Sequence, residues 1–198
     1  MKRRNALAVS LFAAWAMPAS AETVLVLAGH VITDAARPAR GPSTITVTDG
    51  RITAIDDGLA RTFAAGVRVI DLSTKTVLPG LIDAHVHLTG DPGGDFRDEA
   101  VETTESSVVT GAKNARITAL AGFTTVRDLG NILEFVTGMR DSIDAGKGLG
   151  PRILVSGIVD GDGASALGTV RIKTREDIAP VLDRLKAAGC LEVKLYSS

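Results

Sequence analysis

The sequence contains few of the residues that form disulfides, aromatic clusters or nucleic-acid-binding surfaces. It has one cysteine, one tryptophan, one tyrosine and three histidines in 198 residues, and its 22 basic residues nearly balance its 23 acidic ones. A single cysteine excludes an intrachain disulfide, and a small buried side chain is favoured for Cys190 over a reactive thiol. The charge balance argues against nucleic-acid binding, which usually requires a basic patch.

Two further absences narrow the class of protein. The sequence has no Gly-x-x-x-x-Gly-Lys-(Ser/Thr) segment, and no Gly-x-Gly-x-x-Gly opens a helix after a strand. The pair Gly161 and Gly163 lacks a third glycine at the required spacing, so a nucleotide-binding α/β protein is disfavoured. No apolar run reaches the roughly 20 residues that a bilayer-spanning helix needs. The overall 45% of hydrophobic residues is typical of an ordinary globular protein.

The first 21 residues have the pattern of a secretory signal peptide. A basic start at Lys2, Arg3 and Arg4 precedes an apolar run from Ala6 to Met17, and the small-residue segment Pro18-Ala-Ser-Ala21 follows. Cleavage after Ala21 would remove three of the basic residues and leave a mildly acidic chain. We therefore predict an exported protein, periplasmic or secreted, with no membrane attachment after cleavage. An uncleaved anchor is the alternative.

Residues 22–78 are predicted to form a small β-domain. Short alternating or apolar runs follow one another, and Asp49-Gly50 joins two of them in the pattern of a tight hairpin. The expected strands are Val24–Leu27, Val31–Ile32, Thr44–Thr48, Arg51–Ile55 and Val67–Ile70. About five short strands cannot bury both of their faces alone.

From residue 79 to residue 198 strands alternate with helices, which predicts a parallel sheet. Four strands are expected, at 81–87, 123–126, 152–156 and 191–196. Helices are expected from about Asp98 to Leu120, along Ile132, Val136, Met139 and Ile143, and along Ile178 to Leu185 after an Asp177 cap. A loop is expected at 157–168. A closed (β/α)₈ barrel needs eight strands and about 250 residues, so the prediction is an α/β protein holding the first half of such a barrel.

The most informative segment begins at Pro79-Gly80, a turn signal, and runs to His87. On a regular strand Asp83, His85 and His87 would point to the same side. Two imidazoles at this spacing can direct nitrogen atoms to one ion, with Zn–N bonds of about 2.0–2.1 Å. The segment therefore favours a metal site over a strand with two incidental histidines, and Asp83 is expected to support the ligands by hydrogen bonding.

This segment also resembles the first barrel strand of the amidohydrolase superfamily, Gly-(Leu/Met)-(Ile/Val)-Asp-x-His-x-His. It matches in full at Gly80, Leu81, Ile82, Asp83, His85 and His87. The segment Ala121–Gly130 is similar to the second-strand signature of the imidazolonepropionase-like and Xaa-Pro-dipeptidase-like branch. The segment Glu192–Ser197 resembles the fourth-strand segment, which carries a metal-bridging lysine.

The resemblance implies that residues 22–78 form half of a small β-sandwich. It also implies a binuclear metal site that hydrolyses a C–N bond through metal-activated hydroxide. It implies that His85, His87 and a carboxylated Lys194 hold two divalent metals, for which zinc is the first choice. Tyr196 would contact a substrate carboxylate, although a structural role is equally open. Arg127 and Asp128 could orient substrate, but a strand-end turn role is favoured. The family's catalytic aspartate and two further histidines belong to later strands, and no histidine follows His87.

Two interpretations therefore stay open. The first is an exported amidohydrolase acting on a small molecule, either a dipeptide or a cyclic amide, as a single chain or a homo-oligomer. The second is a truncated, non-catalytic chain that binds metal weakly through His85 and His87. Because the later ligands are missing, we expect no hydrolase turnover from these 198 residues alone.

Overall fold

The computed structural model describes residues 22–90, 93, 103–130, 132–161 and 170–196. The chain divides between Pro79 and Gly80 into two compact units. The predicted signal peptide lies outside the described residues. In the part of the chain that is described, no helix is both long enough and apolar enough to cross a membrane.

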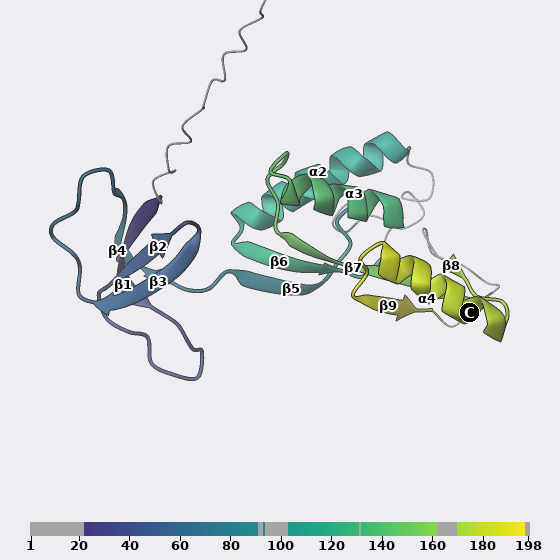
Figure 1. Cartoon of the computed structure of the whole chain (residues 1–198), viewed down its shortest axis with the longest axis horizontal. Coiled ribbons are helices and arrows are strands. Elements are labelled where there is room, and N and C mark those ends of the chain that lie inside the picture. The colour runs from purple at the N-terminus through teal and green to yellow at the C-terminus, as the bar shows by residue number, and fades with distance from the viewer. Residues whose placement is uncertain (1–21, 91–92, 94–102, 131, 162–169, 197–198) are drawn as a thin grey trace, which may run out of the picture. The chain divides into compact units, whose positions relative to one another are not determined.

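The first unit is a four-stranded sheet in the order β3-β2-β1-β4 (Figure 1). Its strands are β1 (Thr23–Val31), β2 (Ser43–Thr48), β3 (Arg51–Asp57) and β4 (Arg68–Val77). The predicted hairpin is confirmed, since β2 pairs antiparallel with β3. Asp49 and Gly50 both have positive φ angles, of 49° and 74°, as a two-residue hairpin turn requires.

The first strand differs from the prediction. The expected break at Ala28-Gly-His30 is absent, and one continuous strand pairs in parallel with β4 across a register shift between Ala28 and His30. A Cβ atom on Gly29 would lie 2.3 Å from the Ser73 carbonyl oxygen. Glycine therefore permits close contact between two strands here, and it does not interrupt the strand.

The second unit alternates strands and helices. Its elements are β5 (Leu81–Val86), α2 (Thr104–Leu120), β6 (Phe123–Asp128), α3 (Leu133–Asp144), β7 (Arg152–Asp160), β8 (Val170–Arg171), the 3₁₀ turn η1 (Arg175–Asp177), α4 (Ile178–Ala187) and β9 (Glu192–Leu195). β5 pairs in parallel with β6, β6 with β7, and β7 with β9. This is the arrangement of the first four strands of a (β/α)₈ barrel, and the predicted fold class is confirmed.

The helices end where the sequence indicates. Gly122, Gly146 and Gly189 follow α2, α3 and α4 with positive φ angles. The predicted start of the first helix near Asp98 lies outside the described residues. In the described part of the chain α2 begins at Thr104. α4 begins directly after Asp177, as predicted, but the Asp177 side chain makes no capping hydrogen bond to α4. Its carboxylate instead accepts hydrogen bonds from the Lys173 and Thr174 amides and so stabilises the turn before the helix.

The core of the second unit lies between the sheet and its helices. Figure 1 shows α2 and α3 over one face of β6 and β7. The buried side chains that pack together are Leu88, Val126, Leu133, Val136, Ile153, Val155, Val159 and Leu185, and Cys190 packs against them. Burial raises the pKa of the Cys190 thiol, an effect that the Arg140 guanidinium partly offsets. The thiolate is therefore disfavoured, which agrees with the structural role expected of this cysteine.

The third barrel strand is longer than predicted. The expected loop from Gly157 begins only after Asp160, and the part at 162–168 lies outside the described residues. Gly157 is buried within β7, and a Cβ atom there would lie 2.5 Å from the Leu185 side chain. The glycine therefore lets α4 approach the strand closely. The wrong prediction came from treating this glycine as a break.

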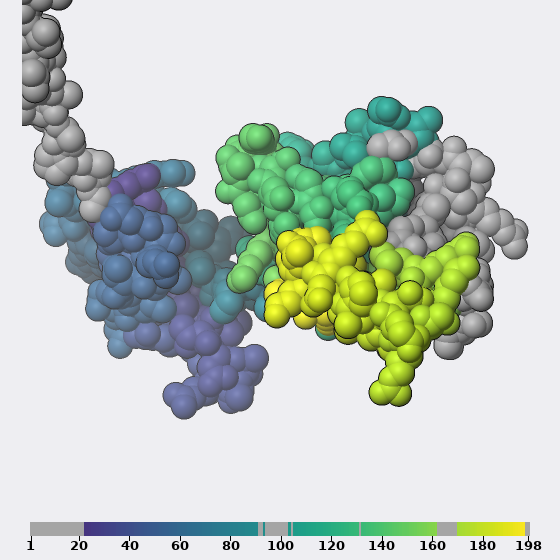
Figure 2. Space-filling view, turned by 45° about the vertical axis from the view of Figure 1, so that its right-hand side comes forward, coloured from purple at the N-terminus to yellow at the C-terminus, as the bar shows by residue number. Residues whose placement is uncertain are grey.

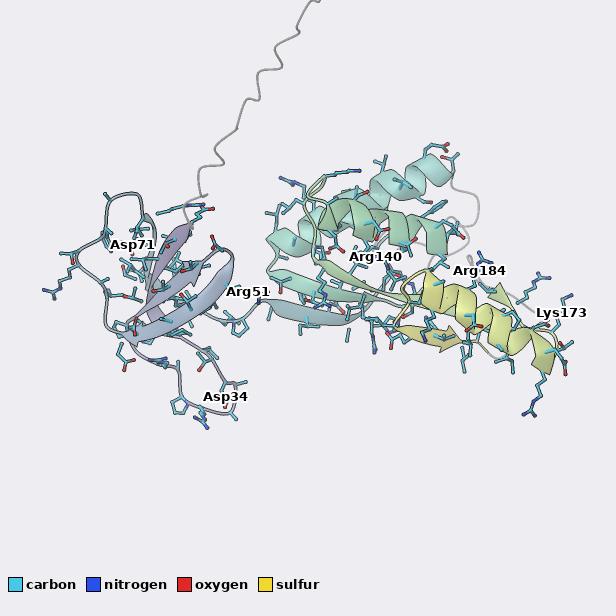
Figure 3. All side chains as sticks on the ribbon, viewed as in Figure 1. Asp34, Arg51, Asp71, Arg140, Lys173 and Arg184 are labelled. Carbon is cyan, nitrogen blue, oxygen red and sulfur yellow. The ribbon has the colours of Figure 1, made fainter. Side chains whose placement is uncertain are left out.

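Two arginines connect α3 to α4 at the surface (Figure 3). Arg184 pairs with Glu134 at 3.0 Å, and the Arg140 guanidinium donates to the Ala188 carbonyl at 3.2 Å. Because the Arg184 and Glu134 side chains are well exposed, this ion pair contributes at most about 1 kcal/mol. Packing of Leu185 against β7 therefore dominates the attachment of α4.

We expect Leu185→Ala to lower the free energy of unfolding by about 2–5 kcal/mol, because a fully buried leucine is replaced by a cavity. Leu182→Ala on the same helix is the control. Leu182 is 42% exposed, whereas Leu185 is 1% exposed, and the chain from α4 to β9 lies at the surface of its unit in Figure 2. Urea unfolding followed by circular dichroism checks both variants. Equal loss of stability in the two would contradict the packing described.

Candidate metal centre

The two histidines of the predicted site lie at the carboxyl end of β5. His85 is on the strand and His87 is just beyond it, and both are exposed. Their ring centroids are 5.4 Å apart, with an angle of 57° between the ring planes. Two imidazoles that share one tetrahedral zinc ion have centroids about 5 Å apart, given Zn–N bonds of about 2.0–2.1 Å. The observed pair therefore has a separation compatible with one shared ion.

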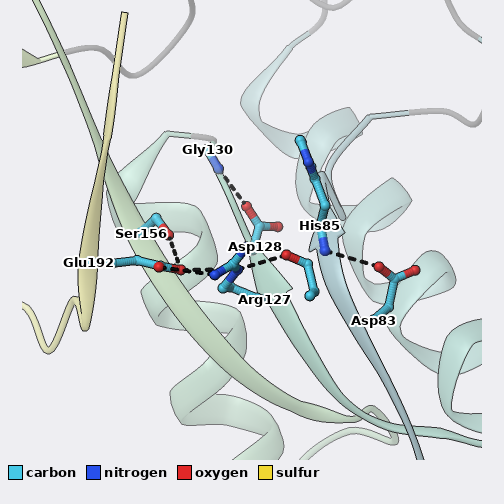
Figure 4. A network of polar contacts seen from close by, with 8 residues as sticks. Asp83, His85, Arg127, Asp128, Gly130, Ser156 and Glu192 are labelled. Carbon is cyan, nitrogen blue, oxygen red and sulfur yellow. Dashed lines mark hydrogen bonds and ion pairs between the residues drawn. The ribbon is translucent and has the colours of Figure 1, made fainter.

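The regular alternation predicted for Asp83, His85 and His87 is interrupted. Asp83 is level with Val126 on β6 and Val86 is level with Asp128, so three residue steps on β5 match two on β6. A bulge of this kind redirects side chains at a strand end. The Asp83 carboxylate accepts a hydrogen bond from the His85 amide at 3.0 Å (Figure 4). Asp83 thus supports the backbone of a predicted ligand.

The His87 ring is held by a backbone carbonyl. Its Nδ1 atom lies 2.7 Å from the carbonyl oxygen of Gly130, in the segment after β6. A carbonyl oxygen only accepts hydrogen bonds, so Nδ1 must carry the proton. When the ring is neutral, the other nitrogen, Nε2, then keeps its lone pair, which is the form that a histidine ligand requires.

A polar network joins the four barrel strands on the side that carries these ligands (Figure 4). Arg127 on β6 donates to the Ala84 carbonyl at 2.7 Å and to Glu192 on β9 at 3.2 Å. Ser156 on β7 donates to the same Glu192 carboxylate at 3.1 Å. Arg127 thus connects the backbone next to His85 with the strand that carries Lys194. Sequence reasoning missed Glu192 and Ser156, although Glu192 lies two positions before Lys194.

Lys194 lies on β9, where it is level with Ile158 of β7. Its ammonium nitrogen is 5.1 Å from the centre of the Tyr196 ring, within the range of a cation–π contact. Two strands separate β9 from β5, and neighbouring strands are about 4.7–4.9 Å apart. The described contacts therefore bring Lys194 to Tyr196, while any approach to the histidines depends on sheet curvature and on the long lysine stem.

The described residues contain no group of three or more histidine, cysteine, aspartate or glutamate side chains arranged to hold a metal ion. His85 and His87 are thus a pair of conventional ligands without a third one of these four residue types in the described part of the chain. A third protein ligand would have to be Lys194 in modified form or a group outside the described residues.

The fold and the site together define an α/β-barrel chain with paired histidines at the end of its first strand. The sequence matches the amidohydrolase family over residues 76–192. The chain belongs to this family.

Comparisons with individual proteins agree with this assignment. The chain is 45% identical to an allantoinase from Enterococcus faecalis over 76 residues, which are 38% of this chain and 13% of that protein. The structure resembles that of a Xaa-Pro dipeptidase, with a TM-score of 0.76, 24% identity, and coverage of 88% of this chain and 47% of the other. It also resembles a proposed prolidase from Bifidobacterium longum, with a TM-score of 0.71, 30% identity, and coverage of 89% and 41%. The chain thus spans less than half the length of each of these proteins.

Proposed function

We propose that the protein hydrolyses a carbon–nitrogen bond of a small substrate, either a dipeptide or a cyclic amide, with the help of divalent metal. The geometry of the histidine pair carries this proposal. His85 and His87 have ring centroids 5.4 Å apart, and the Gly130 carbonyl fixes the Nδ1 proton of His87. Family membership supports the reaction type, and similarity to an allantoinase and to a proposed prolidase supports these two substrate classes.

His85 and His87 would hold the metal through neutral imidazole nitrogens, for which zinc is a suitable ion. Lys194 has donors and no acceptor as an ammonium, so it would contribute only after its amine has been carboxylated. Bound metal would supply Lewis acidity toward the scissile carbonyl and make water more acidic. Tyr196, whose ring centre is 5.1 Å from the Lys194 nitrogen, would contact a substrate carboxylate. Residues 1–21 would direct the protein to the periplasm or the exterior.

A second candidate is a chain that binds metal without turnover. The observation that favours it is the absence of a third conventional ligand near His85 and His87 among the described residues. The two candidates differ in one property, which is whether bound zinc leads to product.

The test is hydrolysis of Xaa-Pro dipeptides and of five- and six-membered cyclic amides by zinc-loaded protein with a complete barrel, because these 198 residues alone are expected to give no turnover. The reaction is followed through release of the new amine. For the hydrolase we expect product that requires zinc and that disappears in the His85→Ala, His87→Ala double variant. Zinc uptake without product from either substrate class would support the second candidate. Product that forms equally in metal-free protein would contradict both.

A further inference from the structure

One buried carboxylate controls the surroundings of His87. Asp128, the last residue of β6, is 1% exposed. Its Oδ2 atom accepts a hydrogen bond from the Leu88 amide at 2.9 Å, and its Oδ1 atom accepts one from the Gly130 amide at 3.1 Å. One carboxylate thus fixes the residue that follows His87 and the residue whose carbonyl holds the His87 ring.

These contacts hold His87 both through its ring and through the backbone that follows it. The chain segment at Leu88 sets the position of His87 from its backbone, and the Gly130 carbonyl sets the ring from its Nδ1 side. Position 130 requires glycine, because its φ angle is 140° and a Cβ atom there would lie 2.5 Å from the Ile158 side chain. A movement of Gly130 would change the 2.7 Å hydrogen bond from the His87 ring, which requires the proton on Nδ1.

We propose that Asp128 is a positioning residue for His87. It holds Gly130 and Leu88 so that His87 keeps its proton on Nδ1 and presents the Nε2 lone pair toward the space beside His85. This inference rests on the proposed metal-binding function and adds a residue to it. The turn role expected for Asp128 from the sequence is part of the same arrangement, because the turn that it stabilises carries the carbonyl that contacts the ring.

The experiment compares the wild type with Asp128→Ala, Asp128→Asn and the control Asp177→Ala. Asp177 is a matched control because its carboxylate also accepts two backbone amide hydrogen bonds in the same unit, from Lys173 and Thr174. Two properties are measured on the purified, untagged chain. One is zinc affinity by competition with a chromogenic chelator. The other is the His87 tautomer in metal-free protein, from long-range ¹H–¹⁵N spectra at pH 8, where imidazole is mostly neutral.

The wild type is expected to have the His87 proton on Nδ1. The chain has three histidines, so spectra of the His85→Ala and His87→Ala variants assign the signals. Asp128→Ala is expected to weaken zinc binding about 10–100-fold and to give a mixture of tautomers. Asp128→Asn keeps one acceptor for the two amides and should lie between. Asp177→Ala should leave zinc affinity and tautomer unchanged.

A merely structural Asp128 would lower the melting temperature while folded protein kept wild-type zinc affinity and tautomer, and that result would overturn the proposal. A wild-type His87 with its proton on Nε2 would also overturn it. If Asp128→Ala does not fold, the same two measurements on Asp128→Asn decide. If the wild type takes up no zinc, the proposed function fails on its own, and the tautomer comparison in metal-free protein still tests Asp128.

Discussion

Replacement of His85 and His87 together by alanine is expected to abolish zinc uptake. The described part of the chain contains no group of three histidine, cysteine, aspartate or glutamate side chains that could hold a metal ion, so no such group could replace the two imidazoles there. We expect the zinc dissociation constant to rise at least about 100-fold, which corresponds to about 2.7 kcal/mol. Elemental analysis after gel filtration and a chelator competition both measure this effect.

His30→Ala is the control for this double variant. His30 is exposed on β1 in the first unit and is the remaining histidine of the chain. The control protein should therefore bind as much zinc as the wild type. Unchanged zinc content in the double variant, or an equal loss in the His30 variant, would show that the metal is held elsewhere or only by nonspecific contacts.

Lys194→Ala is expected to remove a carbamate signal and the metal-dependent activity. Addition of the lysine amine to carbon dioxide forms a nitrogen–carbon bond, releases a proton and converts a group without acceptors into an anionic ligand. With ¹³C-labelled bicarbonate, the wild type should show a carbamate carbonyl resonance that is absent from the variant. Bicarbonate together with a short carboxylic acid should restore part of the activity, since the acid can occupy the space of the missing side chain.

Lys186→Ala provides the comparison, because Lys186 is exposed on α4. That variant should keep both the carbamate resonance and the activity. A Lys194→Ala protein with wild-type activity in the absence of any added acid would end the proposed role of this lysine. If Lys194 served only to contact Tyr196, from whose ring centre its nitrogen lies 5.1 Å, the wild type would show no carbamate resonance.

Much of the fold was predictable because its signals are local. The Asp49-Gly50 turn specified the hairpin, and the alternation of strands with helices specified parallel pairing in the second unit. Two glycines misled the prediction. Gly29 and Gly157 were taken as breaks, but each lies inside a strand at a point where another part of the chain comes very close, Ser73 in one case and Leu185 in the other. Local sequence does not distinguish these two uses of glycine.

The proximity of the two histidine rings was predictable from the sequence, and the contacts that support them were not. The spacing of His85 and His87 pointed to a shared ion, and their rings do lie together. The bulge between Asp83 and Val86 has no local signal, because it appears only when β5 pairs with β6. The bonds from Arg127 to Ala84 and Glu192 likewise depend on the register of strands far apart in sequence. Asp128 was singled out from the sequence, but its effect on His87 could not be predicted. That effect depends on Gly130, whose amide donates to Asp128 and whose carbonyl contacts the His87 ring.

The most direct measurement is anomalous X-ray diffraction at the zinc absorption edge from crystals of the zinc-loaded protein. We expect an anomalous peak at the carboxyl end of β5, about 2.0–2.1 Å from a ring nitrogen of both His85 and His87. A peak bound to only one of these rings, a peak at His30, or no peak at β5 in fully loaded crystals would contradict the shared metal site.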